Sequence, residues 1–331
     1  MLELSFTPHD LTHIRFALSP LWEVVASVRV LKNPADHPLH RPWTEQARPL
    51  LAESGLDWGM LSDLVPVPTR MIAGFVSPPP SIPQPDLDLE LAVLRATPAE
   101  QVRAILDGMP GPRPPGLDPL YTDPEAGLVR LTGIIREYWE LVLAPYWPRI
   151  LRLLDGDVLY RARRLTEGGT ERLFADLDPQ VSWDSDTLYV VNEYFSRSVP
   201  LGGRGLLLVP SVYAWPRVFA KLDGPGQPTL RYPPRGVARL WERDRTDLPQ
   251  ALAAVLGRSR ALLLSELDTP ASTTDLARRT GLSAGGVSQH LTALRDAGLV
   301  NAYRIGRFVL YARTMVAEAL LAGGAPPPES R

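Results

Sequence analysis

Residues 272–300 read STTDLARRTGLSAGGVSQHLTALRDAGLV and carry the start and stop signals of two consecutive helices. Ser272 opens the first helix in the manner of a capping box, and Gly281 can take the left-handed conformation that ends it. Ser283 is the expected cap of the second helix, which should end at Gly298. A short helix, a glycine turn and a second helix together predict a helix-turn-helix.

The second of these helices has two faces that can be assigned by counting. At about 100° per residue, Val287, Leu291 and Leu294 share one stripe, which must face a core. Gln289 lies nearly opposite that stripe, and Ser288 lies at its side. If the N-terminal half of the helix enters the major groove of DNA, Gln289 can pair with adenine and Ser288 can contact a base or a phosphate.

A hairpin is predicted directly after the second helix. Residues 299–311 are expected to form two short strands around a turn at Gly306, and Arg304 and Arg307 lie at the tip of that hairpin. There they can reach a phosphate or the minor groove. The alternative is a plain surface hairpin with solvated arginines, which the position directly after a helix-turn-helix makes the weaker interpretation.

Some of the expected DNA contacts have a second interpretation. Gly285 and Gly286 allow the backbone to approach DNA closely, but they are equally consistent with neutral drift. His290 lies at the edge of the core stripe, so a packing or phosphate role is as well supported as base reading. The residues that we expect to contact double-stranded DNA are Ser283, Gly285, Gly286, Ser288, Gln289, His290, Thr292, Arg295, Arg304 and Arg307.

The last quarter of the chain resembles the ArsR family of winged-helix repressors. The resemblance implies a transcription regulator, expected to be a repressor, that binds a palindromic operator as a homodimer. It places Ser288, Gln289 and His290 in the recognition helix. The residues that carry it are Leu276-Ala277, Thr280-Gly281-Leu282-Ser283, Val287 to Leu291, Leu294, Ala297 to Val300, Arg304 to Arg307, and Tyr311.

The chain departs from this family in its metal-sensing positions. Many ArsR proteins sense metals through cysteines in the first helix of the motif, or through Asp and His in the last helix. This chain has no cysteine, and residues 314–321 contain neither Asp nor His. Metal sensing at those family sites is therefore not expected, and no metal or other cofactor is predicted.

The fold class that we predict is α+β, with a mostly helical N-terminal domain carrying a small antiparallel sheet, followed by the winged helix-turn-helix. Residues 11–31 have helical spacing with an expected kink at Pro20. Strand patterns follow at residues 181–194, 205–215 and 229–232. The predicted domains are residues 1–246, residues 247–322, and a disordered tail at residues 323–331.

The N-terminal domain resembles an extension of unknown function found in some actinobacterial ArsR-like regulators. A region of this size can hold a ligand pocket. We expect it to modulate DNA binding through a small-molecule effector or a partner, or to supply dimer contacts. The segments that carry the resemblance are Arg15 to Leu21, Gly205 to Ser211 and Tyr232 to Gly236.

Composition limits the alternatives. The net charge is −2, but residues 251–331 contain nine arginines against six acids, a local excess of +3 that suits a phosphate-binding surface. The absence of cysteine excludes disulfides and thiolate metal sites within this chain. No apolar run is long enough to span a bilayer, and the start of the chain lacks a signal peptide, so we expect a cytoplasmic protein without membrane contact.

An enzyme is not expected, and no catalytic residue is predicted, because none of the common catalytic or nucleotide-binding motifs occurs. Two histidine pairs leave a metal site open as an alternative: His9 with His13, and His37 with His40. We favour exposed histidines without a metal. The competing function is an N-terminal enzyme or small-molecule-binding module whose winged helix serves for protein contact.

Overall fold

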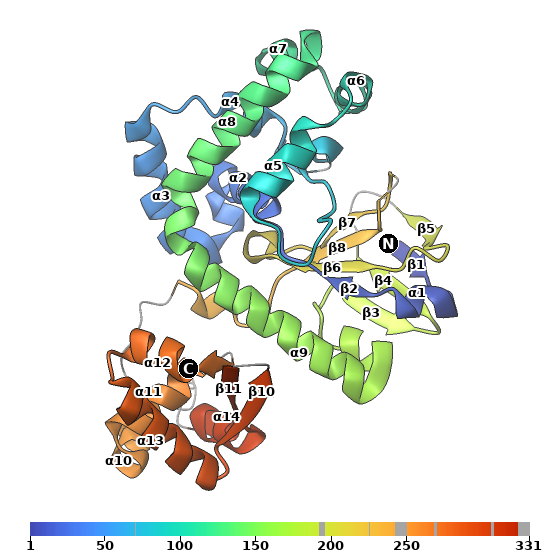
Figure 1. Ribbon diagram of the computed structural model, residues 1–331. Helices are drawn as coiled ribbons and strands as arrows, with labels where there is room; N and C mark the ends of the chain where they lie inside the picture. Colours follow the sequence, from blue (N-terminus) through green and yellow to red (C-terminus); the bar gives the residue numbers. More distant parts are fainter. Residues whose placement is uncertain are drawn as a thin grey trace, which may run out of the picture. The chain divides into compact units, whose positions relative to one another are not determined.

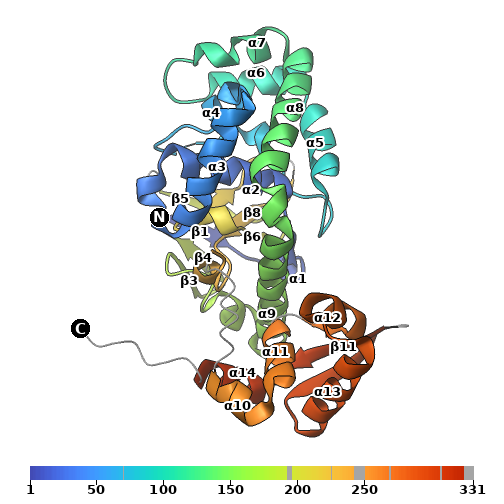
Figure 2. The same cartoon turned by 90° about the vertical axis from the view of Figure 1, so that its left-hand side faces the viewer.

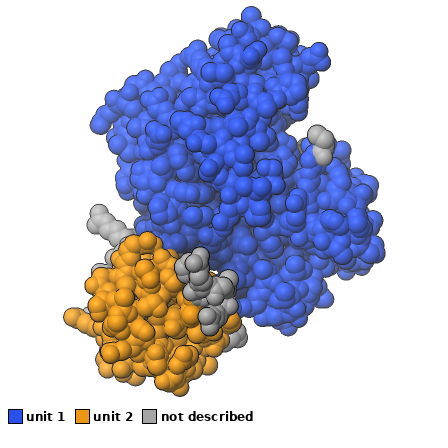
Figure 3. Space-filling model, in the orientation of Figure 1, with its two compact units in different colours: residues 1–241 blue, residues 242–331 orange. Residues whose placement is uncertain are grey.

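The computed structural model forms two compact units, Met1–Trp241 (unit 1) and Glu242–Arg331 (unit 2), which Figure 3 colours separately. Each is described by itself. The expected domain boundary at residue 246 stays a prediction, because it lies outside the described residues, as do residues 324–331 of the expected tail. The structure describes residues 1–69, 71–191, 196–224, 226–241, 250–267, 270–305 and 308–323.

Unit 1 is mostly helical, as predicted. Its central helix is α2 (Pro20–Lys32), which is buried along nearly its whole length. The long helix α8 lies between α3 and α5 (Figure 1, Figure 2). The remaining helices of unit 1 are α1 (Pro8–Thr12), α3 (Arg41–Ser54), α4 (Gly59–Asp63), α5 (Leu87–Arg95), α6 (Ala99–Asp107), α7 (Asp118–Thr122), α8 (Pro124–Val142) and α9 (Trp147–Phe174).

Pro20 begins a helix rather than kinking one, which corrects the expectation for residues 11–31. Ser19 caps α2 by accepting a hydrogen bond from the backbone N–H of Trp22 at 3.0 Å. At the first helical position the missing N–H of proline costs nothing, and its fixed φ suits the helix. The residues before it form α1 and a short strand instead of one continuous helix.

The strands of unit 1 form two mixed sheets, which corrects the expected small antiparallel sheet. In one sheet the order is β3-β4-β1-β5, and β1 runs antiparallel to β4 but parallel to β5. In the other the order is β2-β6-β8-β7, with β2, β6 and β8 parallel. The strands are β1 (Leu2–Ser5), β2 (Arg15–Phe16), β3 (Val181–Asp184), β4 (Thr187–Val190), β5 (Arg197–Pro200), β6 (Leu207–Pro210), β7 (Phe219–Lys221) and β8 (Thr229–Tyr232).

Unit 2 is a helix-turn-helix followed by a hairpin, as predicted. Its three strands pair antiparallel in the order β10-β11-β9. Its core is built mainly from leucines of α11, α12 and α13. The elements are α10 (Gln250–Leu256), α11 (Arg258–Glu266), β9 (Ala271–Ser272), α12 (Thr273–Thr280), α13 (Ala284–Asp296), β10 (Val300–Ile305), β11 (Phe308–Arg313) and α14 (Met315–Gly323). Within the described residues of both units, none of the helices has the length and apolar character needed to cross a membrane.

A buried carboxylate attaches α2 to the turn that follows β6. Glu23 accepts hydrogen bonds from the backbone N–H groups of Val212 at 2.8 Å and Tyr213 at 3.2 Å, and from the Ser211 hydroxyl. Nearly two helical turns further along, Arg29 donates to the carbonyls of Tyr213 and other residues of the same turn. These contacts bind the helical layer to the sheet through α2.

A second buried carboxylate attaches α5 to the start of α2. Glu90 accepts from the Ser19 hydroxyl at 2.6 Å and from the backbone N–H of Leu21 at 2.8 Å. Burial raises the pKa of Glu90 to about 7. Because an isolated buried charge is costly, the folded state holds this proton more tightly than the unfolded chain does.

We predict that Glu90 makes unit 1 lose stability, relative to a Glu90→Gln variant, as the pH rises from 4.5, the ordinary pKa of its carboxyl, to about 7. A carboxyl whose pKa is raised by folding stabilises the folded state at pH values below its ordinary pKa. That contribution is lost as the pH rises through the pKa of the folded state. Each carboxyl lowers the free energy of unfolding by about 1.4 kcal/mol per pH unit across that range. Glu23, whose pKa is also raised to about 7, adds the same dependence, whereas buried His37 and His40, with pKa values lowered to about 4 and about 3, act in the opposite direction up to pH 6.5. The contribution of Glu90 is therefore the difference between variant and parent.

Urea unfolding followed by tryptophan fluorescence measures this, because all eight tryptophans lie in unit 1. Glu90→Gln can keep both hydrogen bonds without titrating, so its free energy of unfolding should rise relative to that of the parent by about 1.4 kcal/mol per pH unit between pH 4.5 and 7. Glu100→Gln, at an exposed position of α6, is the control and should keep the pH slope of the parent. Equal slopes for all three proteins would contradict the prediction.

Candidate nucleic-acid interface

The first helix of the motif, α12, is capped at both ends by the residues that the sequence indicated. The Ser272 hydroxyl oxygen accepts from the backbone N–H of Asp275 at 3.2 Å, and the hydroxyl donates to the Asp275 carboxylate at 2.7 Å. This side-chain hydrogen bond lowers the pKa of Asp275. Gly281 ends the helix with φ at +71° and donates its N–H to the carbonyl of Ala277.

The second helix, α13, begins at its expected cap. The Ser283 hydroxyl accepts from the backbone N–H of Gly286 at 3.2 Å. The stripe of Val287, Leu291 and Leu294 is at most 1% exposed, so this face packs into the core of unit 2. The rotation of α13 about its own axis is thereby determined.

The opposite face of α13 is open to solvent. Gly285, Ser288, Gln289 and Thr292 are exposed, whereas His290 is half-buried. A Cβ atom added at Gly285 would meet nothing within 4 Å. Within the described residues, the Gln289 amide has no hydrogen-bond partner, so both its donor and its acceptor are available to a ligand.

Arginines flank this open face, and two of them were not among the residues expected to contact DNA. Arg295 on α13 was expected and is 50% exposed. Arg278 on α12 is 76% exposed and pairs with Asp275, and its neighbour Arg279 reaches the carbonyl of Glu266 at 3.5 Å. The signal for both was their place in the last turn of the first helix of the motif.

The hairpin that was predicted directly after α13 is present. Its two strands, β10 and β11, pair from Val300 with Arg313 to Ile305 with Phe308. The tip lies outside the described residues, as do the whole of Arg307 and the side chain of Arg304. Tyr303 on β10 is 48% exposed, so the hairpin presents one aromatic side chain to solvent at this position.

The histidine pairs of unit 1 differ from the expectation in one respect. His9 and His13 are exposed, as expected, with ring centroids 4.3 Å apart. His37 and His40 are 4% and 0% exposed, which corrects the view that all four histidines are exposed. Their burial lowers the pKa to about 4 for His37 and to about 3 for His40.

His40 takes part in packing instead. Its Nδ1 atom accepts from the indole N–H of Trp241 at 3.0 Å, and its ring lies 5.1 Å from that of Tyr213. A search of the described residues finds no group of three or more His, Cys, Asp or Glu side chains placed to hold a metal ion.

The fold and the exposed helix of unit 2 define a winged helix-turn-helix, a class of domain that binds DNA. Residues 260–302 match the family model of the bacterial regulatory protein, arsR family. Residues 117–238 match a family of unknown function, DUF5937. No curated protein and no solved structure matches the chain.

The C-terminal unit therefore contains a match to the ArsR family, and a match to a family of unknown function precedes it. This arrangement is the one that the sequence resemblance implied. The ArsR domain makes the chain a DNA-binding transcription regulator. Catalysis is not the activity of that family.

Ser283→Ala should destabilise α13, because the substitution leaves the N–H of Gly286 without its cap. The expected cost is about 1 kcal/mol, which is roughly a fivefold increase in local opening. Unit 2 contains no tryptophan, so amide hydrogen exchange of α13 in the full chain is the suitable measurement. Ser288→Ala is the matched control, and equal exchange in the two variants would show that the cap is unimportant.

Proposed function

We propose that this chain is a sequence-specific repressor of the ArsR type, which binds a palindromic operator as a homodimer and is controlled through unit 1. The observation that carries the proposal is the exposed, unpartnered Gln289 on the face of α13 opposite its buried stripe. Such a face is what a recognition helix presents to the major groove.

The residues around Gln289 divide into base-reading and backbone-positioning roles. Gln289 pairs with the edge of an adenine, and Ser288 contacts the neighbouring base or its phosphate. Gly285 and Gly286 carry no side chains in the first turn, so the backbone N–H groups at the start of α13 can approach a phosphate.

The remaining expected contacts serve mainly to position the helix. Ser283 and Thr292 border the exposed face, and Arg295 reaches a phosphate beside it. Arg304 and Arg307 on the wing contact the phosphate backbone or the minor groove. His290 is half-buried and is assigned to packing or a phosphate contact rather than to base reading.

A second copy of the chain accounts for the exposed apolar side chains of unit 2. Val316 and Leu320, 58% and 43% exposed, are four residues apart on α14 and share one face. Val255 on α10 is 82% exposed. A twofold dimer that covers them would bind a palindromic operator if its two α13 helices reach half-sites about 34 Å apart, one turn of DNA.

Control through unit 1 does not rest on metal binding in this proposal. The chain has no cysteine, and α14 carries no Asp or His in its described part. Unit 1 is the larger unit and contains the domain of unknown function. The effector is therefore proposed to be a small molecule or partner that binds unit 1.

The DNA contacts are tested with a binding site selected from random DNA by the full chain. Gln289→Ala should relax specificity at one base pair, with a loss of about 1–3 kcal/mol of discrimination there. Arg307→Ala should weaken binding to all sequences and lower the salt slope by about 1.

Gln101→Ala, at an exposed position of unit 1, is the control and should bind like the parent. If both variants of unit 2 also bound like the parent, the assignment of α13 and the wing would be wrong. Weak, equal affinity of the parent for every DNA sequence would favour a protein-contact role for the winged helix.

The proposed dimer is tested by sedimentation equilibrium of the full chain. Leu320→Asp places a charge on the apolar face of α14, so it should convert a dimer into monomers and weaken operator binding. Leu159→Asp is the matched control, because Leu159 on α9 has the same exposed fraction of 43%. A dimeric Leu320→Asp variant, or a monomeric parent, would contradict the proposed interface.

A further inference from the structure

A hollow of about 460 Å³ opens on unit 1 where α8 gives way to α9, beside the start of α5. Its size lies within the range of small-molecule sites. Its lining comes from the start of α2 and a residue shortly before it, from the end of the proline-rich loop with the start of α5, from the last turns of α8 and from the first turns of α9.

The floor and one wall of this hollow are apolar. Leu18 and Leu87 are buried beneath it, at 2% and 8% exposure. Trp139 and Trp147 line it while half-buried, with their rings packed edge to face at a centroid distance of 5.0 Å. Within the described residues neither indole N–H has a hydrogen-bond partner.

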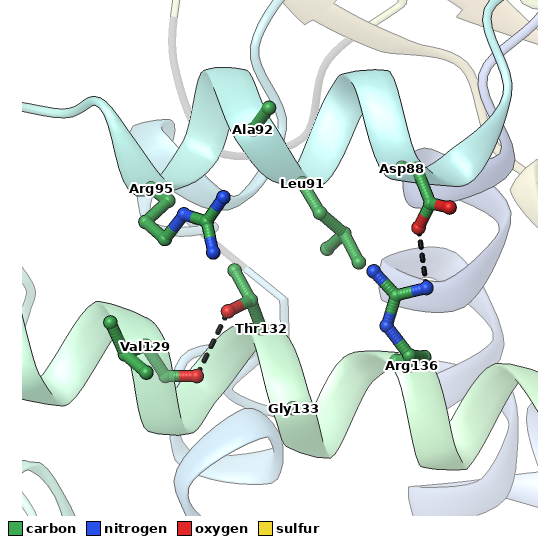
Figure 4. A pocket seen from close by; sticks show the side chains of 8 residues that line it. All are labelled: Asp88, Leu91, Ala92, Arg95, Val129, Thr132, Gly133 and Arg136. Carbon is green, nitrogen blue, oxygen red and sulfur yellow. Dashed lines mark hydrogen bonds and ion pairs between the residues drawn. The ribbon is translucent and has the colours of Figure 1, made fainter.

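The charged residues that line the hollow are predominantly acidic. Asp86, Asp88 and Glu140 face a single base, Arg136, which leaves a net charge of −2. Arg136 forms an ion pair with Asp88 between α8 and α5 (Figure 4), so its charge is already compensated. Asp86 caps α5 by accepting a hydrogen bond from the backbone N–H of Leu89, and within the described residues no base forms an ion pair with it.

The hollow exists without any rearrangement of its walls. The proline-rich loop is held by a hydrogen bond from the N–H of Leu18 to the carbonyl of Pro83 at 2.8 Å. Gln84 of the same loop donates its side-chain N–H to Asp155 on α9, also at 2.8 Å. A site that is already formed loses less affinity to ordering when a ligand enters.

We propose that this hollow binds a small organic cation with an aromatic or otherwise apolar body. The apolar floor and the two indoles receive the body, and a cation near the tryptophans gains from the ring quadrupoles. Asp86 and Glu140 supply the opposite charge. An anion of the same shape finds no uncompensated base there.

The ion pair at the edge of this hollow also borders a second, smaller one. Asp88 and Arg136 line a groove of about 190 Å³ between α5 and α8, together with Arg95 and Thr132 (Figure 4). A cation that attracts Asp88 competes with Arg136, and the contact between α5 and α8 then changes. This consequence for DNA binding rests on the proposed function, whereas the binding itself does not.

The experiment uses two probes of nearly the same shape and opposite charge, tetraphenylphosphonium and tetraphenylborate, titrated into the full chain by calorimetry. We expect saturable binding of one phosphonium ion per chain and at least about tenfold weaker binding of the borate. Glu140→Gln should weaken phosphonium binding about fivefold, because it removes one uncompensated charge. Glu137→Gln, exposed on α8 but outside the hollow, should bind like the parent.

Three results would overturn the proposed site: no saturable phosphonium binding up to roughly millimolar concentration, equal binding of the two ions, or equal effects of the two glutamate substitutions.

A second titration adds the phosphonium to the complex of the chain with its selected DNA. A change in DNA affinity that is lost in Glu140→Gln supports the role of the site in regulation, and no change overturns that role alone. A chain that binds the phosphonium but no specific DNA contradicts the proposed function and leaves the site supported.

Discussion

The burial of Val287, Leu291 and Leu294 is the constraint on which the account of unit 2 depends. Burying an aliphatic side chain of this size stabilises a fold by about 1.5–3 kcal/mol, so three of them outweigh the roughly 1 kcal/mol that each of Gly285 and Gly286 costs in helix propensity. Helix α13 can therefore form although its first turn contains two glycines. Because the stripe determines the rotation of α13, it also determines that Gln289 faces solvent.

Unit 2 could be predicted in detail because its signals are local. Ser272 and Ser283 each bond a backbone N–H only three residues away, and Gly281 takes a positive φ at the end of α12. The hairpin of β10 and β11 follows a pattern contained within residues 300–313. Each of these features is specified by a few neighbouring residues, so periodicity and capping rules suffice. The roles of individual residues toward DNA remain predictions.

The sheets of unit 1 were predicted incorrectly because their pairing is not local. β1 lies between β4 and β5, whose residues are more than 180 positions away along the chain. The sequence close to β4 or to β5 contains no signal for pairing with β1. The burial of His40 depends likewise on packing by Tyr213 and Trp241. Long-range contacts of this kind cannot be obtained from spacing alone.

The same topology shows that the domain of unknown function is larger than its matched residues, 117–238. Strands β1 and β2 complete both sheets from the first sixteen residues, and α2 joins the sheet to the helices through Glu23. The hollow beside α5 and α8 is built from residues on both sides of that boundary. In this chain the compact structural unit that contains the matched residues is therefore the whole of unit 1.

The central claim is that the exposed face of α13 lies in the major groove of DNA. Because the chain has no cysteine, Thr292→Cys allows a DNA-cleaving iron chelate to be attached at one position on that face. If α13 lies in the groove, we expect cleavage of the selected DNA at two symmetric positions, about one helical turn apart and on either side of the palindrome centre. Cleavage scattered along the DNA, or equal to that from a chelate attached at Leu159→Cys on unit 1, would contradict it.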